Sequence, residues 1–124
     1  MVIAMVIINE IKMKKSIKNC PVEHAVDLLG GKWKLPIIHS LVKQSPLRFK
    51  ELEREITGIT PAVLTHHLRS LESDRLVKRE TFATVPPTVE YSLTELGKSI
   101  QPMITELKRW GLFHKAQILK EEAG

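Results

Sequence analysis

Residues 57–73, with the sequence TGITPAVLTHHLRSLES, contain the pattern that decides the fold. Gly58 lies in a short turn, Thr60 is a good helix N-cap, and Pro61 fits the first helical position. Residues 48–56 before the turn have apolar side chains at helical spacing. Two consecutive helices joined by a short turn that contains glycine are typical of a helix-turn-helix. The sequence therefore predicts this motif, with a second helix over residues 61–73.

The second helix of this motif has one apolar face and one polar face. Spaced at about 100° per residue, the apolar face contains Leu64, Leu68 and Leu71, with His67 beside them. The opposite side contains Ala62, Thr65, His66 and Arg69. A helix that enters the major groove of DNA needs small or hydrogen-bonding side chains and a long basic one. We therefore predict DNA contacts for this side and for Thr60 and Pro61, although the helix alone would also fit an ordinary solvated surface.

The segments on both sides of the motif complete the architecture. Residues 20–31 and 33–45 each have helical periodicity and end in glycine or Ser-Pro signals. Residues 76–83 and 89–93 are strand-like and enclose a loop with two prolines, which makes a β-hairpin. Thr94 then caps a last long helix. This order predicts a mainly α fold with a small β-hairpin, a winged helix-turn-helix.

Four further basic residues are candidates for phosphate contacts. Arg48 and Lys50 open the helix before the turn, and Lys78 and Arg79 lie at the base of the hairpin. The sequence alone does not distinguish phosphate-binding residues from ordinary surface charges at these positions. The 19 Lys and Arg against 14 Asp and Glu give a net charge of +5, which favours double-stranded DNA as a partner. The side chains of residues 84–88 at the wing tip are not suited to strong binding in the minor groove.

The last helix has more apolar residues than a domain of this size readily covers. We predict that the excess forms a homodimer interface together with the first helix, and packing within one monomer is the alternative. The predicted interface residues are Val22, Val26, Ile100, Met103, Ile104, Leu107 and Trp110.

The single cysteine excludes a disulfide framework within the chain and fits a reducing, cytoplasmic location. Cys20 lies at a helix N-terminus near Lys18 and His24, and such surroundings lower the pKa of a thiol and make it reactive. A small, semi-buried apolar side chain is the other interpretation. Cys20 and His24 stand four residues apart, but the chain lacks the spacing of a four-ligand zinc site.

The sequence also lacks the motifs of several other protein classes. It has no catalytic or phosphate-loop signature and no apolar stretch long enough to cross a membrane. We therefore expect a protein that is not an enzyme, with no cofactor, no metal and no membrane partner. A winged-helix protein-interaction module and a metal-responsive regulator remain alternatives.

Several motifs in a fixed order extend across residues 20–111. They are Cys20-Pro21-Val22-Glu23, Gly30-Gly31-Lys32-Trp33, Arg48-Phe49-Lys50-Glu51-Leu52, Gly58-Ile59-Thr60, Leu64-Thr65, Leu68-Arg69, Leu71-Glu72, Val85-Pro86-Pro87, Val89-Glu90-Tyr91-Ser92-Leu93-Thr94 and Trp110-Gly111. Together they resemble the HxlR-type regulators, a branch of the MarR-like winged-helix transcription factors. The chain departs from that pattern at Arg75, where glycine is usual, and at Thr88, where a basic residue is common.

The resemblance implies a homodimeric, cytoplasmic regulator that binds pseudo-palindromic operators. In several such proteins the cysteine of the Cys-Pro motif senses electrophiles or oxidants, which makes Cys20 a redox-sensing candidate and a small electrophile or oxidant a candidate effector. The resemblance also divides the chain into an N-terminal extension (1–19), the winged helix-turn-helix domain (20–111) and a C-terminal helical tail (112–124). Met13 is closer than Met1 to the usual start of the family.

Overall fold

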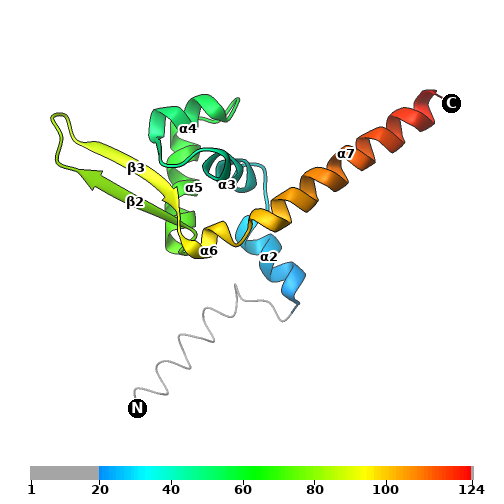
Figure 1. The fold of residues 1–124 in the computed structure, drawn as a ribbon, viewed down its shortest axis with the longest axis horizontal. Coiled ribbons are helices and arrows are strands. Elements are labelled where there is room, and N and C mark those ends of the chain that lie inside the picture. The colour runs from blue at the N-terminus through cyan, green and yellow to red at the C-terminus, as the bar shows by residue number, and fades with distance from the viewer. Residues whose placement is uncertain (1–19, 124) are drawn as a thin grey trace, which may run out of the picture. The chain divides into compact units, whose positions relative to one another are not determined.

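The computed structural model describes residues 20–123, so the predicted extension over residues 1–19 lies outside the described part. Backbone contacts divide the chain into two units, with the boundary after Lys32. The elements in chain order are α2 (Pro21–Leu29), α3 (Lys34–Lys43), β1 (Leu47–Arg48), α4 (Phe49–Glu55), α5 (Pro61–Ser73), β2 (Val77–Phe82), β3 (Thr88–Leu93), α6 (Glu95–Lys98) and α7 (Gln101–Ala123) (Figure 1). Helix α2 belongs to the first unit, and the other described elements form the second.

The helix-turn-helix consists of α4, a turn and α5, and α5 has the predicted bounds. The Thr60 hydroxyl accepts a hydrogen bond from the Val63 backbone N–H at 3.3 Å, which is the expected N-cap. Gly58 in the turn has a φ of +86°, a conformation that side chains with a Cβ rarely adopt. The buried residues of α5 are Leu64, Leu68 and Leu71, as predicted.

The wing is an antiparallel three-stranded sheet with the order β1-β3-β2. The β2–β3 hairpin was predicted, and it extends past the helices in Figure 1. Strand β1 was not predicted, because two residues are too few to show the alternation of a strand. In β1, Leu47 pairs with Tyr91 and Arg48 pairs with Glu90. Helix α4 therefore begins one residue later than expected, and Arg48 is its N-cap.

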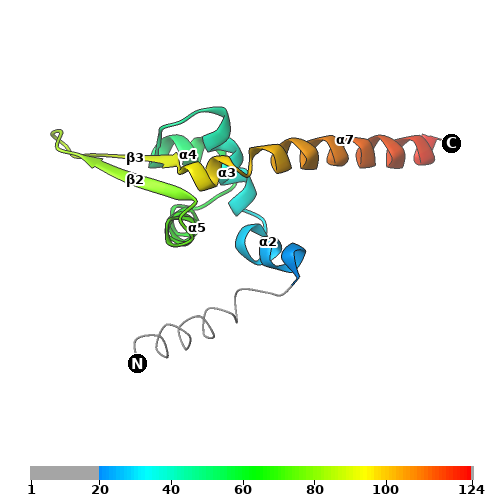
Figure 2. The same cartoon turned by 60° about the horizontal axis from the view of Figure 1, so that its bottom comes forward.

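The core of the second unit is formed by α3, α4, α5 and the sheet. Figure 2 shows α5 alongside the hairpin, in agreement with its backbone contacts to β2, while α3 contacts β3 and α4. The side chains that are less than 2% exposed are Ile37, Ile38, Leu41, Leu52, Leu64, Leu68 and Leu71. This aliphatic core fixes α5 against the wing, so the two elements present one continuous surface.

The prediction of a single long helix after Thr94 is wrong in one respect, because the structure has two helices there. Helix α6 ends at Lys98, and α7 begins at Gln101. Pro102 has no N–H to donate to the carbonyl four residues earlier, so a helix cannot run through this point. Proline is tolerated in a first turn, and α7 then continues without a break to Ala123.

The junction between α5 and α6 is held by a compact set of polar contacts. The Thr94 hydroxyl accepts a hydrogen bond from the Gly97 N–H at 3.0 Å and donates one to the Arg75 carbonyl at 2.6 Å. Arg75 has a φ of +62°, so an arginine occupies the left-handed position where the family pattern has glycine. Gly97 is buried against the Leu76 carbonyl, where a Cβ would collide with backbone.

Candidate nucleic-acid interface

The polar side of α5 faces solvent as the sequence predicted. Ala62, His66 and Arg69 are exposed, and Thr65 is half-buried. The cap residues Thr60 and Pro61 at the start of the helix are exposed as well. A helix end with small side chains can approach base edges closely, and an arginine further along the helix has the reach for a guanine or a phosphate.

His67 belongs to the opposite side of α5 and packs against the domain. Partial burial lowers the pKa of His67 below its usual 6.5, and the charges of His66 and Lys34 lower it further. Its imidazole is therefore neutral at pH 7, and its Nδ1 atom is buried without a hydrogen-bond partner. The neighbouring ring of His66 lies edge-on, with 5.1 Å between the ring centroids. Of the two histidines, His66 is the one available to DNA.

A small recess joins α5 to the wing. Thr65 and Arg69 of α5, Arg79 of β2 and Tyr91 of β3 line a cavity of about 210 Å³. Glu72 contributes the only carboxylate among the described residues of this recess. Two guanidinium groups around one recess suit phosphate oxygens or the O6 and N7 atoms of guanine. The structure thus brings together three predicted contact residues from two separate segments.

The neighbouring basic residues of the wing base lie on opposite faces of the sheet. Arg79 pairs across the sheet with Tyr91 and borders the recess beside α5. Lys78 pairs with Ser92 and lines a different pocket, and its Nζ atom is 3.4 Å from a carboxylate oxygen of Glu80. Successive side chains of a strand alternate between its two faces. The structure therefore does not bring Lys78 to the surface that Arg69 and Arg79 share.

The start of α4 forms a second surface of mixed charge next to the wing loop, with Glu51 and Glu90 beside its basic residues. Arg48 and Lys50 line a cavity of about 740 Å³ together with Arg54, a basic residue that the sequence analysis did not select. The Arg48 backbone N–H donates to a carboxylate oxygen of Glu51 at 2.9 Å, so this helix start already has an anionic partner. Lys50 forms an exposed ion pair with Glu53 at 3.5 Å, which stabilises little. Phosphate binding here would rely on the side chains.

Helix α7 leaves most of its apolar residues uncovered. Met103, Leu107 and Trp110, which we predicted to face a second subunit, are exposed, and Trp110 reaches 63%. Its indole ring stacks on His114, with 5.3 Å between the ring centroids. The helix also exposes apolar residues that the sequence analysis did not select, namely Leu112, Phe113, Ile118 and Leu119.

The remaining predicted interface residues divide into two groups. Val22 and Val26 of α2 are 71% and 59% exposed. Ile100 is half-buried. Ile104 is only 6% exposed, since α7 contacts α3 at its beginning, so this side chain belongs to the core. Its assignment to a dimer interface is thereby corrected, because it has almost no surface left for a partner chain.

Cys20 occupies the N-cap position of α2 and is exposed. Its side chain makes no capping hydrogen bond, and its carbonyl accepts the His24 N–H at 3.0 Å. Over residues 20–123, no group of three or more His, Cys, Asp or Glu side chains is placed to hold a metal ion. None of the helices described is both long and apolar enough to span a bilayer.

Comparisons with known proteins agree on one family. The family model described as HxlR-like helix-turn-helix matches residues 28–118. The HTH-type transcriptional regulator BH0655 of Halalkalibacterium halodurans is 46% identical over 98 residues, which cover 79% of this chain and 87% of the relative. The redox regulator HypR in its reduced form has a TM-score of 0.76 at 40% identity, over 82% of this chain and 99% of HypR.

Related structures include an oxidised and a chemically treated protein. The oxidised form of HypR has a TM-score of 0.70 at 44% identity, over 74% of this chain and 94% of HypR. Diamide-treated YodB from Bacillus subtilis has a TM-score of 0.63 at 37% identity, over 73% of this chain and 90% of YodB. The relatives matched are HTH-type transcriptional regulators. The chain therefore belongs to the HxlR-like helix-turn-helix family of transcriptional regulators.

Proposed function

We propose that this regulator binds specific, pseudo-palindromic operator DNA as a homodimer, with α5 of each subunit in a major groove. The observation that carries the proposal is the recess in which Thr65 and Arg69 of α5 meet Arg79 of β2. Helix-turn-helix dimers read half-sites about one helical turn of DNA apart. In such an arrangement Arg69 and Thr65 would face base edges or nearby phosphates, while Arg79 would add charge from the wing.

The proposed second subunit would cover the exposed side of α7. This helix has 23 residues, and only Ile104 among them is buried. Monomeric proteins rarely leave an extended apolar surface in water, and a two-fold axis lets the same surface serve both subunits. Met103, Leu107 and Trp110 are the side chains that we expect to pack against the partner copy, with Val22 and Val26 of α2.

The first test is binding of the reduced full-length chain to its own upstream DNA. Fluorescence anisotropy with that duplex and with a scrambled duplex, across a salt series, gives both the preference and the salt dependence. We expect preferential binding of the upstream duplex, a steep loss of affinity with salt, and a mass in sedimentation of two chains of 14.1 kDa each. A shallow salt slope with equal affinity for both duplexes would contradict the proposal and favour a protein-interaction module.

We also propose that modification of Cys20 controls operator binding. The support is the exposed position of Cys20 at the start of α2 and the similarity to HypR, a redox regulator, and to YodB, which was solved after diamide treatment. A modified thiol would change the angle of α2, and with it the spacing of the two recognition helices in the dimer.

Oxidant should therefore release the wild-type protein from its operator but leave the Cys20→Ser variant bound. Anisotropy with the upstream duplex before and after treatment with diamide measures this difference. Addition of a thiol reductant should restore binding by the wild-type protein. Release that persists in Cys20→Ser would exclude Cys20 as the sensor without affecting the proposed DNA-binding role.

A further inference from the structure

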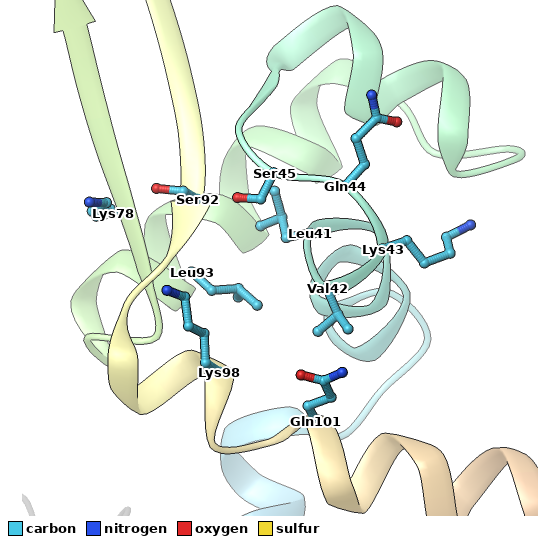
Figure 3. A pocket seen from close by; sticks show the side chains of 10 residues that line it. All are labelled: Leu41, Val42, Lys43, Gln44, Ser45, Lys78, Ser92, Leu93, Lys98 and Gln101. Carbon is cyan, nitrogen blue, oxygen red and sulfur yellow. The ribbon is translucent and has the colours of Figure 1, made fainter.

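A pocket of about 650 Å³ lies at the root of the wing and has none of the residues that line the recess at α5. Its walls come from the C-terminal end of α3, the root of the wing and the junction between α6 and α7 (Figure 3). The volume is in the range of sites that hold small organic ligands. The pocket includes the position where the last helix breaks. It shares no lining residue with the recess at α5, although the sequence had predicted a DNA contact for Lys78.

The charge of this pocket is positive. It is lined by Lys43, Lys78 and Lys98, and no carboxylate belongs to its lining among the described residues. In Figure 3, the Lys98 amine extends toward Ser92 and Leu93, whereas the Lys43 amine points away from the pocket. Lys98 and Lys78 pair with Glu95 and Glu80 at 3.2 and 3.4 Å, both outside the lining. These pairs are exposed, and an exposed pair is weak enough for a bound anion to replace it.

The floor of the pocket is apolar. Leu41 and Leu93 close its bottom at 1% and 4% exposed, and the half-buried Val42 at the end of α3 presents the accessible apolar surface. Uncharged hydrogen-bonding groups complete the lining, with the hydroxyl of Ser45 and the amide of Gln101 among them (Figure 3). An apolar floor under a few convergent polar groups is the usual composition of a small-molecule site.

From this arrangement we propose that the pocket binds a small organic anion, a carboxylate with an apolar body. The carboxylate would accept a hydrogen bond from Lys98, with Lys78 adding positive charge from the wing root, and the apolar body would lie on Val42. A ligand in this position contacts α3, the wing root and the first turn of α7 at once. This inference rests on the proposed dimer. In that dimer, the bound ligand would act as an effector, because it would change the orientation of α7 relative to the wing and thereby the affinity for the operator.

The test uses 2-naphthoate as the probe and the neutral 2-naphthamide as its uncharged counterpart. Both are titrated into the reduced full-length protein and followed by backbone amide chemical shifts in NMR. We expect saturable binding of naphthoate with shifts at Ser45, Ser92 and Lys98, and much weaker binding of the amide. The Lys98→Gln variant should bind naphthoate about tenfold more weakly, which is the scale of one hydrogen bond between charged groups. Lys115→Gln, on exposed α7 outside the pocket, is the matched control and should bind like the wild type.

Three results would overturn the site. These are equal binding of naphthamide, unchanged affinity in Lys98→Gln, and shifts confined to the exposed apolar side of α7. Inorganic phosphate that displaces naphthoate at equal concentration would instead mark the pocket as a surface for DNA phosphates.

The effector role has its own readout. Saturating naphthoate should change the operator affinity of the wild type severalfold and leave that of Lys98→Gln unchanged, and equal operator affinity with and without naphthoate would contradict regulation. Naphthoate binding is measured without DNA. A failure of operator binding would therefore contradict the proposed function but not the proposed ligand site.

Discussion

The Arg69→Ala substitution is expected to weaken binding to the specific operator by about 1–3 kcal/mol, or roughly 5- to 150-fold. Arg69 is exposed on the polar side of α5 and borders the recess that also contains Arg79. Alanine removes every hydrogen bond that the guanidinium makes and leaves α5 intact, because alanine is the best helix former. Anisotropy with the upstream duplex and with its scrambled counterpart measures the loss.

Comparison of the two duplexes identifies the group that Arg69 contacts. If Arg69 reads a base, the specific duplex loses affinity and the scrambled duplex does not. If it binds a phosphate, both affinities fall alike and the salt slope decreases by about one. The control is Lys120→Ala in the last turn of α7, which removes the same charge far along that helix. Unchanged affinity in Arg69→Ala would remove this residue from the interface.

The Gly97→Ala substitution is expected to lower the free energy of unfolding by about 1–3 kcal/mol, the range for a side chain forced into a packed site. The Cβ atom would meet the carbonyl of Leu76, and that carbonyl already accepts the Thr94 N–H at 3.1 Å. Because the obstacle is backbone and not a flexible side chain, α6 would have to move away from the wing root. Urea denaturation followed by circular dichroism measures the change.

Gly111→Ala is the matched control for this substitution. Gly111 also lies in a helix, but a Cβ there meets nothing within 4 Å. Alanine should therefore stabilise α7 by about 0.5–1 kcal/mol through its higher helix propensity. The two substitutions have opposite expected signs, and equal effects at both positions would contradict the close packing of Gly97.

Local signals explain why α5 was predicted with its correct bounds. Thr60, Pro61 and the glycine of the turn specify the start of the helix through contacts between near neighbours in the sequence. Strand β1 lacks any such signal, since Leu47 and Arg48 become a strand only by pairing with β3, more than forty residues later. The break before α7 did have a signal in Pro102, but the prediction rested on the apolar periodicity alone and did not use it.

The candidate site was predictable only in part, for a similar reason. Helical periodicity selects exposed Met103 and buried Ile104 alike, and only the packing of α7 on α3 separates them. The meeting of Arg69 with Arg79 depends on how α5 lies against the sheet, which sequence spacing does not specify. The pocket at Lys98 required the break between α6 and α7, which the expected single helix did not contain.

The opposite orientation of Lys78 and Arg79 limits how the wing can change during evolution. Insertion of one residue between Val77 and Lys78 would shift the pairing with β3 by one position and turn every following side chain of β2 to the other face. Arg79 would then leave the recess at α5, and Lys78 would take its place. Length changes at the tip, over residues 83–87, leave this pairing intact. Related proteins should therefore vary the length of the wing at its tip and keep the spacing between α5 and this pair of basic residues constant.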